Sequence, residues 1–107
     1  MSDEFSDREK GFERKFQLDQ DQLFRAQARR DKLFGQWAAA KFGRTDVEKY
    51  AAEVVDSNFE RPGDDDMLGK VKADFKAAGV TVSDTDVAKA LHDAFAAAAA
   101  QIAAEKK

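Results

Sequence analysis

Residues 5–37 read FSDREKGFERKFQLDQDQLFRAQARRDKLFGQW, and their large apolar side chains recur at a helical interval. At about 100° per residue, the following fall within roughly 60° of one another on a helical wheel: Phe5, Phe12, Phe16, Leu23, Phe34 and Trp37. Charged residues occupy the opposite face. The pattern predicts a strongly amphipathic helix, with Ser6 and Glu9 as a capping box at its start.

The apolar stripe of this helix is longer than a small domain can cover. We expect the helix to reach about Phe42 and to end at Gly43, so it would be on the order of 50 Å long. Asp19 interrupts the stripe. We interpret the section from Leu23 to Trp37 as core, and the section from Phe5 to Phe16 as a surface offered to a partner.

Length and composition limit the class of protein. The chain has 107 residues, 43% of them hydrophobic and 36% charged, which fits one small domain with a single modest core. It has no cysteine, so disulfides and thiolate chemistry are excluded. No signal-peptide run or membrane-spanning stretch is present, and we expect a soluble cytoplasmic protein.

Charge argues against nucleic acid as the main ligand. The formal net charge is -3, and the basic side chains of residues 1–34 are matched by acidic ones in the same stretch. An unopposed basic face, which binding to phosphate backbones requires, is therefore missing.

The rest of the chain predicts three further helices. Thr45 and Glu48 are interpreted as a capping box for a second helix that ends near Asn58. Pro62-Gly63 marks a turn, after which a third helix runs to Gly79. A fourth helix begins at Ser83, with Asp86 as its capping partner. The expected buried positions are Val47, Tyr50, Ala51, Val54 and Val55; Leu68, Val71, Phe75 and Ala78; and Val87, Leu91, Phe95, Ala98 and Ile102.

These elements predict an all-α fold, namely a four-helix bundle with a long first helix and a flexible N-terminal segment. No stretch alternates convincingly enough for a strand, and short loops favour antiparallel neighbours. Gly35 interrupts the first helix at a cost of about 1 kcal/mol relative to alanine, which suggests a close neighbour or a bend. The alanines at 96–100 would also let another helix approach closely.

Sites for metals, nucleotides or catalysis are poorly supported by the sequence. His92 is the only histidine, and we interpret it as structural or solvated rather than as a ligand. Residues 64–66 are three aspartates at a helix start, but an EF-hand beginning at Asp64 would need glutamate where Phe75 stands. The stretch from Gly63 to Lys70 departs from a phosphate loop in spacing. We expect no cofactor, no metal and no enzymatic activity.

The N-terminal stripe has a partner-binding interpretation instead. The neighbours of Phe5, Phe12 and Phe16 are nearly all charged. Such a segment cannot bury enough surface by itself to offset its ordering entropy. We expect it to be loose alone and helical when docked in a partner's groove.

Three motifs resemble a known family. Residues 7–16 read DREKGFERKF, residues 24–39 read FRAQARRDKLFGQWAA and residues 59–64 read FERPGD. Together they resemble the zeta inhibitor of alphaproteobacterial ATP synthases, with the Ala-Arg-Arg block before Trp37 as the most specific part. Beyond Val71 the likeness is mainly helical pattern.

The resemblance implies a mechanism that needs no chemistry on the inhibitor. An N-terminal segment of residues 1–18, mobile when free, would enter the catalytic head (alpha, beta and gamma subunits) of an F-type ATP synthase and block its rotation. Residues 19–107 would form the four-helix bundle. The segment's apolar anchors would be Phe5, Phe12 and Phe16, and its rim pairs would come from Arg8, Glu9, Glu13 and Lys15.

The resemblance also implies a place in the cell. The protein would be a monomer when free, without membrane insertion, and would lie at the cytoplasmic face of the membrane through ATP synthase. Two other hypotheses stay open: a helical adaptor that binds another protein through the same stripe, and a small-molecule or nucleotide sensor with a pocket between helices. Deleting residues 1–18 distinguishes them, because a ligand pocket in the bundle would survive the deletion.

Overall fold

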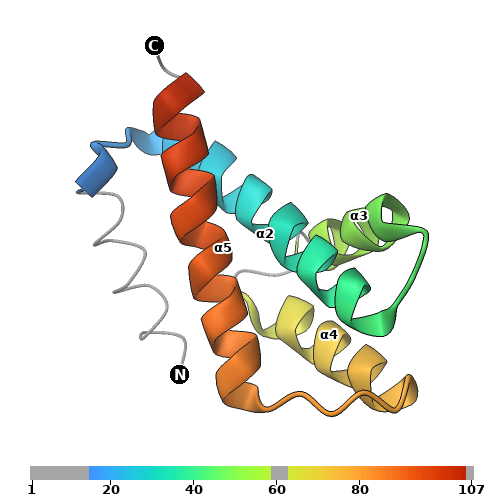
Figure 1. The fold of residues 1–107 in the computed structure, drawn as a ribbon. Coiled ribbons are helices and arrows are strands. Elements are labelled where there is room, and N and C mark those ends of the chain that lie inside the picture. Colours follow the sequence, from blue (N-terminus) through green and yellow to red (C-terminus); the bar gives the residue numbers. More distant parts are fainter. Residues whose placement is uncertain (1–14, 59–62, 106–107) are drawn as a thin grey trace.

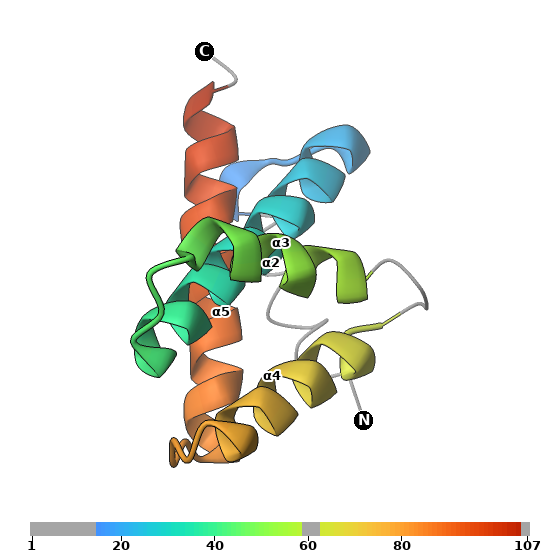
Figure 2. The ribbon, with the colours of Figure 1, turned by 90° about the vertical axis from the view of Figure 1, so that its right-hand side faces the viewer.

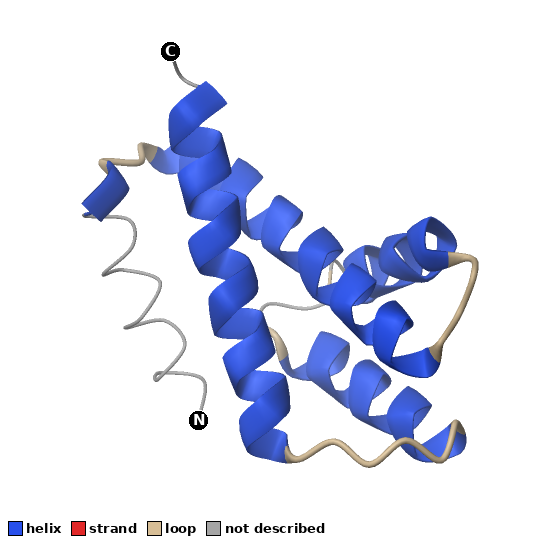
Figure 3. Ribbon diagram, in the orientation of Figure 1, coloured by secondary structure: helices blue, strands red, loops and turns tan. Residues whose placement is uncertain are grey.

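The chain folds into a bundle of α-helices in a computed structural model that describes residues 15–58 and 63–105. The helices are α2 (Gln20–Phe42), α3 (Val47–Ser57), α4 (Asp65–Ala77) and α5 (Asp84–Glu105). No strand occurs in the described ranges (Figures 1 and 3). The predicted all-α bundle is confirmed.

Helix α2 is the central element. It packs along α3 on one side and α5 on the other. Helix α4 packs mainly against α3 and lies below it in Figure 2. The two long helices, α2 and α5, cross at an angle (Figure 1), and the molecule measures 41 × 30 × 24 Å along its principal axes.

A main core joins all four helices. Its buried side chains are Phe34, Ala38 and Ala39 of α2, Tyr50 and Val54 of α3, Met67, Val71 and Phe75 of α4, and Val87, Leu91 and Ala94 of α5. Trp37 is half-buried at its border, stacked on Phe34 at 5.7 Å and edge-on to Phe75 at 5.6 Å between ring centroids. Each large side chain removed from water here contributes roughly 1.5–3 kcal/mol.

A second apolar cluster lies where the first half of α2 meets the last half of α5. It consists of Leu18, Ala26, Phe95, Ala99 and Ile102. Phe16, Leu23 and Ala103 pack against it while remaining half-buried. The stripe of α2 is thus divided between two cores, and both halves of α5 supply buried residues.

The predicted continuous first helix is wrong. Residues 15–16 are helical, Gln17 takes a left-handed φ of 54°, and a new helix starts at Gln20. Asp19 is the N-cap of α2: its Oδ1 accepts from the backbone N–H of Gln22 at 2.8 Å, and the Gln22 side chain accepts from the Asp19 N–H at 3.0 Å. The residue interpreted as a polar interruption in one helix therefore begins the next one.

Two smaller predictions are also wrong. Thr45 and Glu48 do not cap α3, whose N-cap is Asp46 without a side-chain cap bond. Glu48 instead accepts a hydrogen bond from Gln36 of α2 at 2.9 Å. Ala78, placed on the buried face of the third helix, is exposed because α4 has already ended there.

The other helix ends agree with the sequence. Gly43 ends α2 with φ 71°, and its N–H donates to the carbonyl of Ala40 at 3.1 Å. The Ser83 hydroxyl accepts from the Asp86 N–H at 3.0 Å at the start of α5. The predicted buried positions of α5 are all buried.

Gly35 faces α3 at close range. A Cβ built on Gly35 would lie 2.8 Å from the Cα of Ala51 and 3.1 Å from the Cβ of Val54. Because the first of these contacts is with backbone, a side chain at position 35 would push the two helices apart. The expectation of a close neighbour at this glycine is confirmed.

Among the described residues, none of the helices combines the length and the apolar character that crossing a bilayer requires.

Candidate functional site

Most of the predicted partner-binding residues lie outside the described part of the chain: Phe5, Arg8, Glu9, Phe12 and Glu13. The structure places the other two, Lys15 and Phe16. Lys15 is exposed, and its Nζ lies 5.5 Å from the centroid of the Phe16 ring. Phe16 is half-buried against the second cluster. The end of the predicted stripe is therefore attached to the bundle.

The attachment is built by the turn between Phe16 and α2. The left-handed Gln17 reverses the backbone, and the next residue, Leu18, is buried with only 7% of its surface exposed. The capping box of Asp19 and Gln22 then fixes the start of α2. Phe16 and Leu18 are thereby held at the junction of α2 and α5.

At the same end of the molecule, one ion pair and one hydrogen bond connect α2 to α5. Arg29 of α2 pairs with Glu105 near the end of α5, and it also donates to Gln101 at 3.3 Å. This guanidinium lowers the pKa of the Glu105 carboxyl below its ordinary value. The pair joins the helix ends beside the junction.

A buried polar cluster lies midway along α2. Arg30, only 3% exposed, contacts Asp31 at 2.9 Å and Asp64, the N-cap residue of α4, at 2.8 Å. Asn58, at the end of α3, donates to Asp31 at 2.9 Å and to Asp64 at 3.1 Å. The cluster therefore connects the end of α3 and the start of α4 to the central helix α2.

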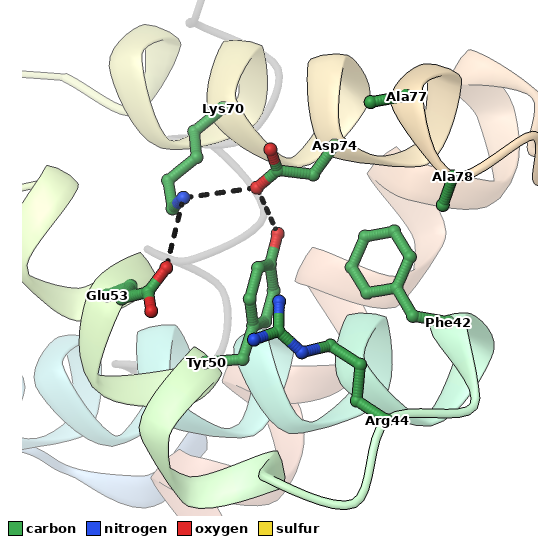
Figure 4. A pocket seen from close by; sticks show the side chains of 8 residues that line it. All are labelled: Phe42, Arg44, Tyr50, Glu53, Lys70, Asp74, Ala77 and Ala78. Atoms are coloured by element: carbon green, nitrogen blue, oxygen red, sulfur yellow. Dashed lines mark hydrogen bonds and ion pairs between the residues drawn. The ribbon is translucent and has the colours of Figure 1, made fainter.

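An open pocket of about 470 Å³ lies between α3, α4 and the end of α2 (Figure 4). Its polar lining is joined by contacts within the protein. The Tyr50 hydroxyl donates to Asp74 Oδ2 at 2.7 Å. Lys70 lies 3.1 Å from the same oxygen and 3.5 Å from Glu53. Arg44 lies over the Tyr50 ring, 4.9 Å from its centroid, and pairs with Asp46 at 2.7 Å.

The polar groups that line this pocket are paired within the protein. Burial and the bond to Asp74 raise the pKa of the Tyr50 phenol, which therefore stays protonated and acts as a donor. Lys70 and Arg44 each pair with a carboxylate. The contacts of Tyr50 with Asp74 and of Lys70 with Glu53 connect α3 to α4 across this pocket.

Metal ligation has no assembled donor set in the described residues. No group of three or more histidine, cysteine, aspartate or glutamate side chains there is arranged to hold an ion. His92 is half-buried on the flank of α5.

Sequence reasoning missed two features of the N-terminal end. Leu18 was not assigned to a core, although it is buried in the second cluster. Phe24 lies outside the predicted stripe, yet it is a large apolar side chain that is 63% exposed on α2. The spacing of Asp19 and Gln22 is that of a capping box, and it indicates that a helix begins after Asp19. Leu18 then lies before that helix and cannot be placed by its position on a helical wheel.

Comparison with known proteins identifies one family. A family model described as ATPase inhibitor subunit zeta matches residues 1–101. The matched range contains the N-terminal stripe, α2, α3, α4 and most of α5. No curated protein matches the chain.

Proposed function

The chain belongs to the ATPase inhibitor subunit zeta family, and from this premise we propose that it suppresses ATP hydrolysis by an F-type ATP synthase by inserting its N-terminal segment into the catalytic head. The observation that carries the proposal is the extent of the match. It covers residues 1–101, so the Phe5 to Phe16 stripe lies inside the matched range together with the bundle.

In the proposed mechanism, residues 5–16 form a helix between two subunits of the head. Phe5, Phe12 and Phe16 are its apolar anchors, and charged side chains at its rim set its orientation: Arg8, Glu9, Glu13 and Lys15. A rotary enzyme opens and closes its subunit interfaces at every step. A helix wedged in one of them stops rotation without any chemistry on the inhibitor.

The bundle's part in this mechanism is to present the segment. The turn at residues 16–19 fixes the point at which the segment leaves the body, beside the ends of α2 and α5. The polar groups of the Tyr50 pocket pair with one another, which favours a structural role there over a ligand site. The sites of binding are the alpha, beta and gamma subunits at the cytoplasmic face of the membrane.

Phe12→Ala tests the anchor role. A buried phenylalanine contributes about 1.5–3 kcal/mol, so we expect inhibition of ATP hydrolysis by the isolated catalytic head to weaken by roughly 10- to 100-fold. The measurement is the concentration of inhibitor at half-maximal ATPase rate.

Phe24→Ala is the matched control, because it removes the same side chain from an exposed position outside the stripe. It should inhibit like the unchanged chain. If Phe12→Ala and Phe24→Ala inhibit equally well, the stripe is not the inhibitory element. If a folded full chain does not inhibit at all, the adaptor hypothesis replaces this one.

A further inference from the structure

The first described residues are fixed to the bundle without a free linker. Leu18 belongs to the second apolar cluster, and Phe16 packs against it. Directly after them, Asp19 and Gln22 begin α2 with a capping box. The point at which the chain leaves the bundle, at Lys15, is therefore set by the fold.

The length of chain before this point limits how far the bundle can lie from its partner. In the proposed mechanism, Phe12 is lodged inside the catalytic head. Phe12 and Lys15 are three residues apart, and three residues span at most about 11 Å in any conformation. When Phe12 is surrounded by the head, the surface of the bundle beside Lys15 must therefore lie against the head or within a few ångströms of it.

The surface beside Lys15 is formed by the end of α5. Figure 1 shows residues 15–19, in blue, next to the upper half of α5 and on the side away from α3 and α4. Ala103 of α5 packs against the same cluster as Phe16. Its neighbours Ala100 and Ala104 are exposed. Helix α4 lies far from this end in both Figure 1 and Figure 2, so only one end of the bundle can face the head.

The charges of this surface indicate what it fits. Lys15 is exposed and lies over the Phe16 ring, and among the described residues no carboxylate is within ion-pair distance of it. Arg29 and Glu105, at the same end, neutralise each other. The complementary partner surface therefore supplies a carboxylate for Lys15 and an uncharged area for the end of α5.

We propose that the end of α5 around Ala100 and Ala104, with Lys15 at its edge, is a second contact with the catalytic head, made outside the cleft that the N-terminal segment enters. This inference rests on the proposed function. Because a few residues join the two contacts, the second forms with little further loss of entropy once the first is made. The bundle then contributes to affinity besides presenting the segment.

Site-specific crosslinking tests the contact. The chain has no cysteine, so Ala100→Cys gives a single position for a short photoactivatable crosslinker. Ala73→Cys is the matched control, because Ala73 is an exposed alanine of α4. With the full chain bound to the isolated catalytic head, we expect a crosslink to the head from position 100 and none from position 73. Equal yields from the two positions overturn the proposal.

Inhibition tests whether the contact contributes to binding. Ala100→Glu places a bulky negative charge on a surface that we expect to face an uncharged area and a carboxylate, whereas Ala73→Glu places it on α4. With folding verified by circular dichroism, Ala100→Glu should raise the concentration for half-maximal inhibition of ATP hydrolysis several-fold, and Ala73→Glu should leave it unchanged. Equal effects of the two substitutions overturn the contribution of α5.

The two measurements also separate this inference from the proposed function. A chain that inhibits ATP hydrolysis but does not crosslink from position 100 overturns the second contact and leaves the proposed function standing. A folded chain that neither inhibits nor crosslinks to the head overturns both. Phe24 remains a valid control for the N-terminal stripe: at about 100° per residue it lies some 140° around α2 from Arg29, which faces α5.

Discussion

At the scale of single residues, Gly35 sets the separation of α2 and α3. A Cβ at this position would meet the backbone of Ala51 at 2.8 Å. Gly35→Ala gains about 1 kcal/mol of helix propensity but forces two packed helices apart. Overpacking of this kind costs about 1–3 kcal/mol, and we expect a net loss in the free energy of unfolding measured by urea denaturation.

Gly69→Ala supplies the comparison within the same fold. Gly69 lies inside α4, and nothing lies within 4 Å of a Cβ built on it. Here only the propensity term acts, so the variant should be more stable by up to about 1 kcal/mol. If both alanine variants shift stability in the same direction, the close contact between α2 and α3 is not the reason for glycine at position 35.

Asp31 gives stability a distinctive dependence on pH. Burial raises the pKa of its carboxyl above the ordinary 3.8, although Arg30 and Asn58 oppose the shift. Between pH 3.8 and that raised pKa, the folded state holds more protons at this site than the unfolded state. The contribution of Asp31 to stability is therefore full below 3.8 and is lost as pH rises through the folded pKa.

Asp31→Asn isolates this contribution. The free energy of unfolding of the original chain minus that of the variant should increase as pH falls from 7 towards 4. Carboxyls with lowered pKa values, such as Asp46 at about 2 and Glu105, act in the opposite direction. They are present in both chains and cancel in the difference. A difference that is constant with pH, measured by urea denaturation, would contradict the assignment.

At the scale of elements, the start of α2 depends on the capping box of Asp19 and Gln22. Asp19→Ala removes the side chain that satisfies the Gln22 N–H, and the loss of an N-cap costs about 1 kcal/mol. We expect lower stability and faster amide exchange in the first turn of α2, which NMR can measure.

Asp21→Ala is the control for this effect. Asp21 is also acidic and lies in the same turn, but it is exposed and only pairs with Arg25 four residues on, at 2.8 Å. Pairs of that kind contribute about 0.3–0.5 kcal/mol. Equal losses in the two variants would mean that the aspartates act through charge at the helix N-terminus and not through capping.

Local patterns in the sequence predict those elements whose determinants are neighbours in the chain. The core positions of α5, from Val87 to Ile102, follow from spacing alone, and so do the helix ends at Gly43 and Ser83. In α4, however, Met67 is fully buried, whereas the predicted Leu68 is only half-buried. The helical period alone does not show which of these two neighbours is buried. Packing against the other helices decides it.

Other features could not be read from local patterns. The pairing of Arg30 with Asp64 joins residues 34 positions apart, and nothing near Arg30 in the sequence indicates its partner. The break at residues 17–19 was missed because the apolar stripe continues in phase across it: Phe16 and Leu23 occupy similar angles on a helical wheel although they belong to different helical segments. Periodicity cannot distinguish a helix from two helices that share a face.

At the scale of the whole molecule, the two apolar clusters have different roles. The main core joins α2, α3, α4 and α5, and none of the described residues before α2, 15–19, belongs to it. The second cluster includes Leu18, with Phe16 packed on it. Removal of residues 1–18 would therefore damage the bundle at this end, whereas removal of residues 1–14 leaves every described contact of the second cluster in place.

The most direct test of the account is ATP hydrolysis by the isolated catalytic head of an F-type ATP synthase, titrated with the full chain and with a chain that begins at Lys15. Circular dichroism and thermal unfolding should show the shortened chain to be folded. The account predicts saturable inhibition by the full chain, weakened at least tenfold or abolished in the shortened one, because the anchors at Phe5 and Phe12 are gone. Undiminished inhibition by the folded shortened chain would contradict it and place the inhibitory surface on the bundle.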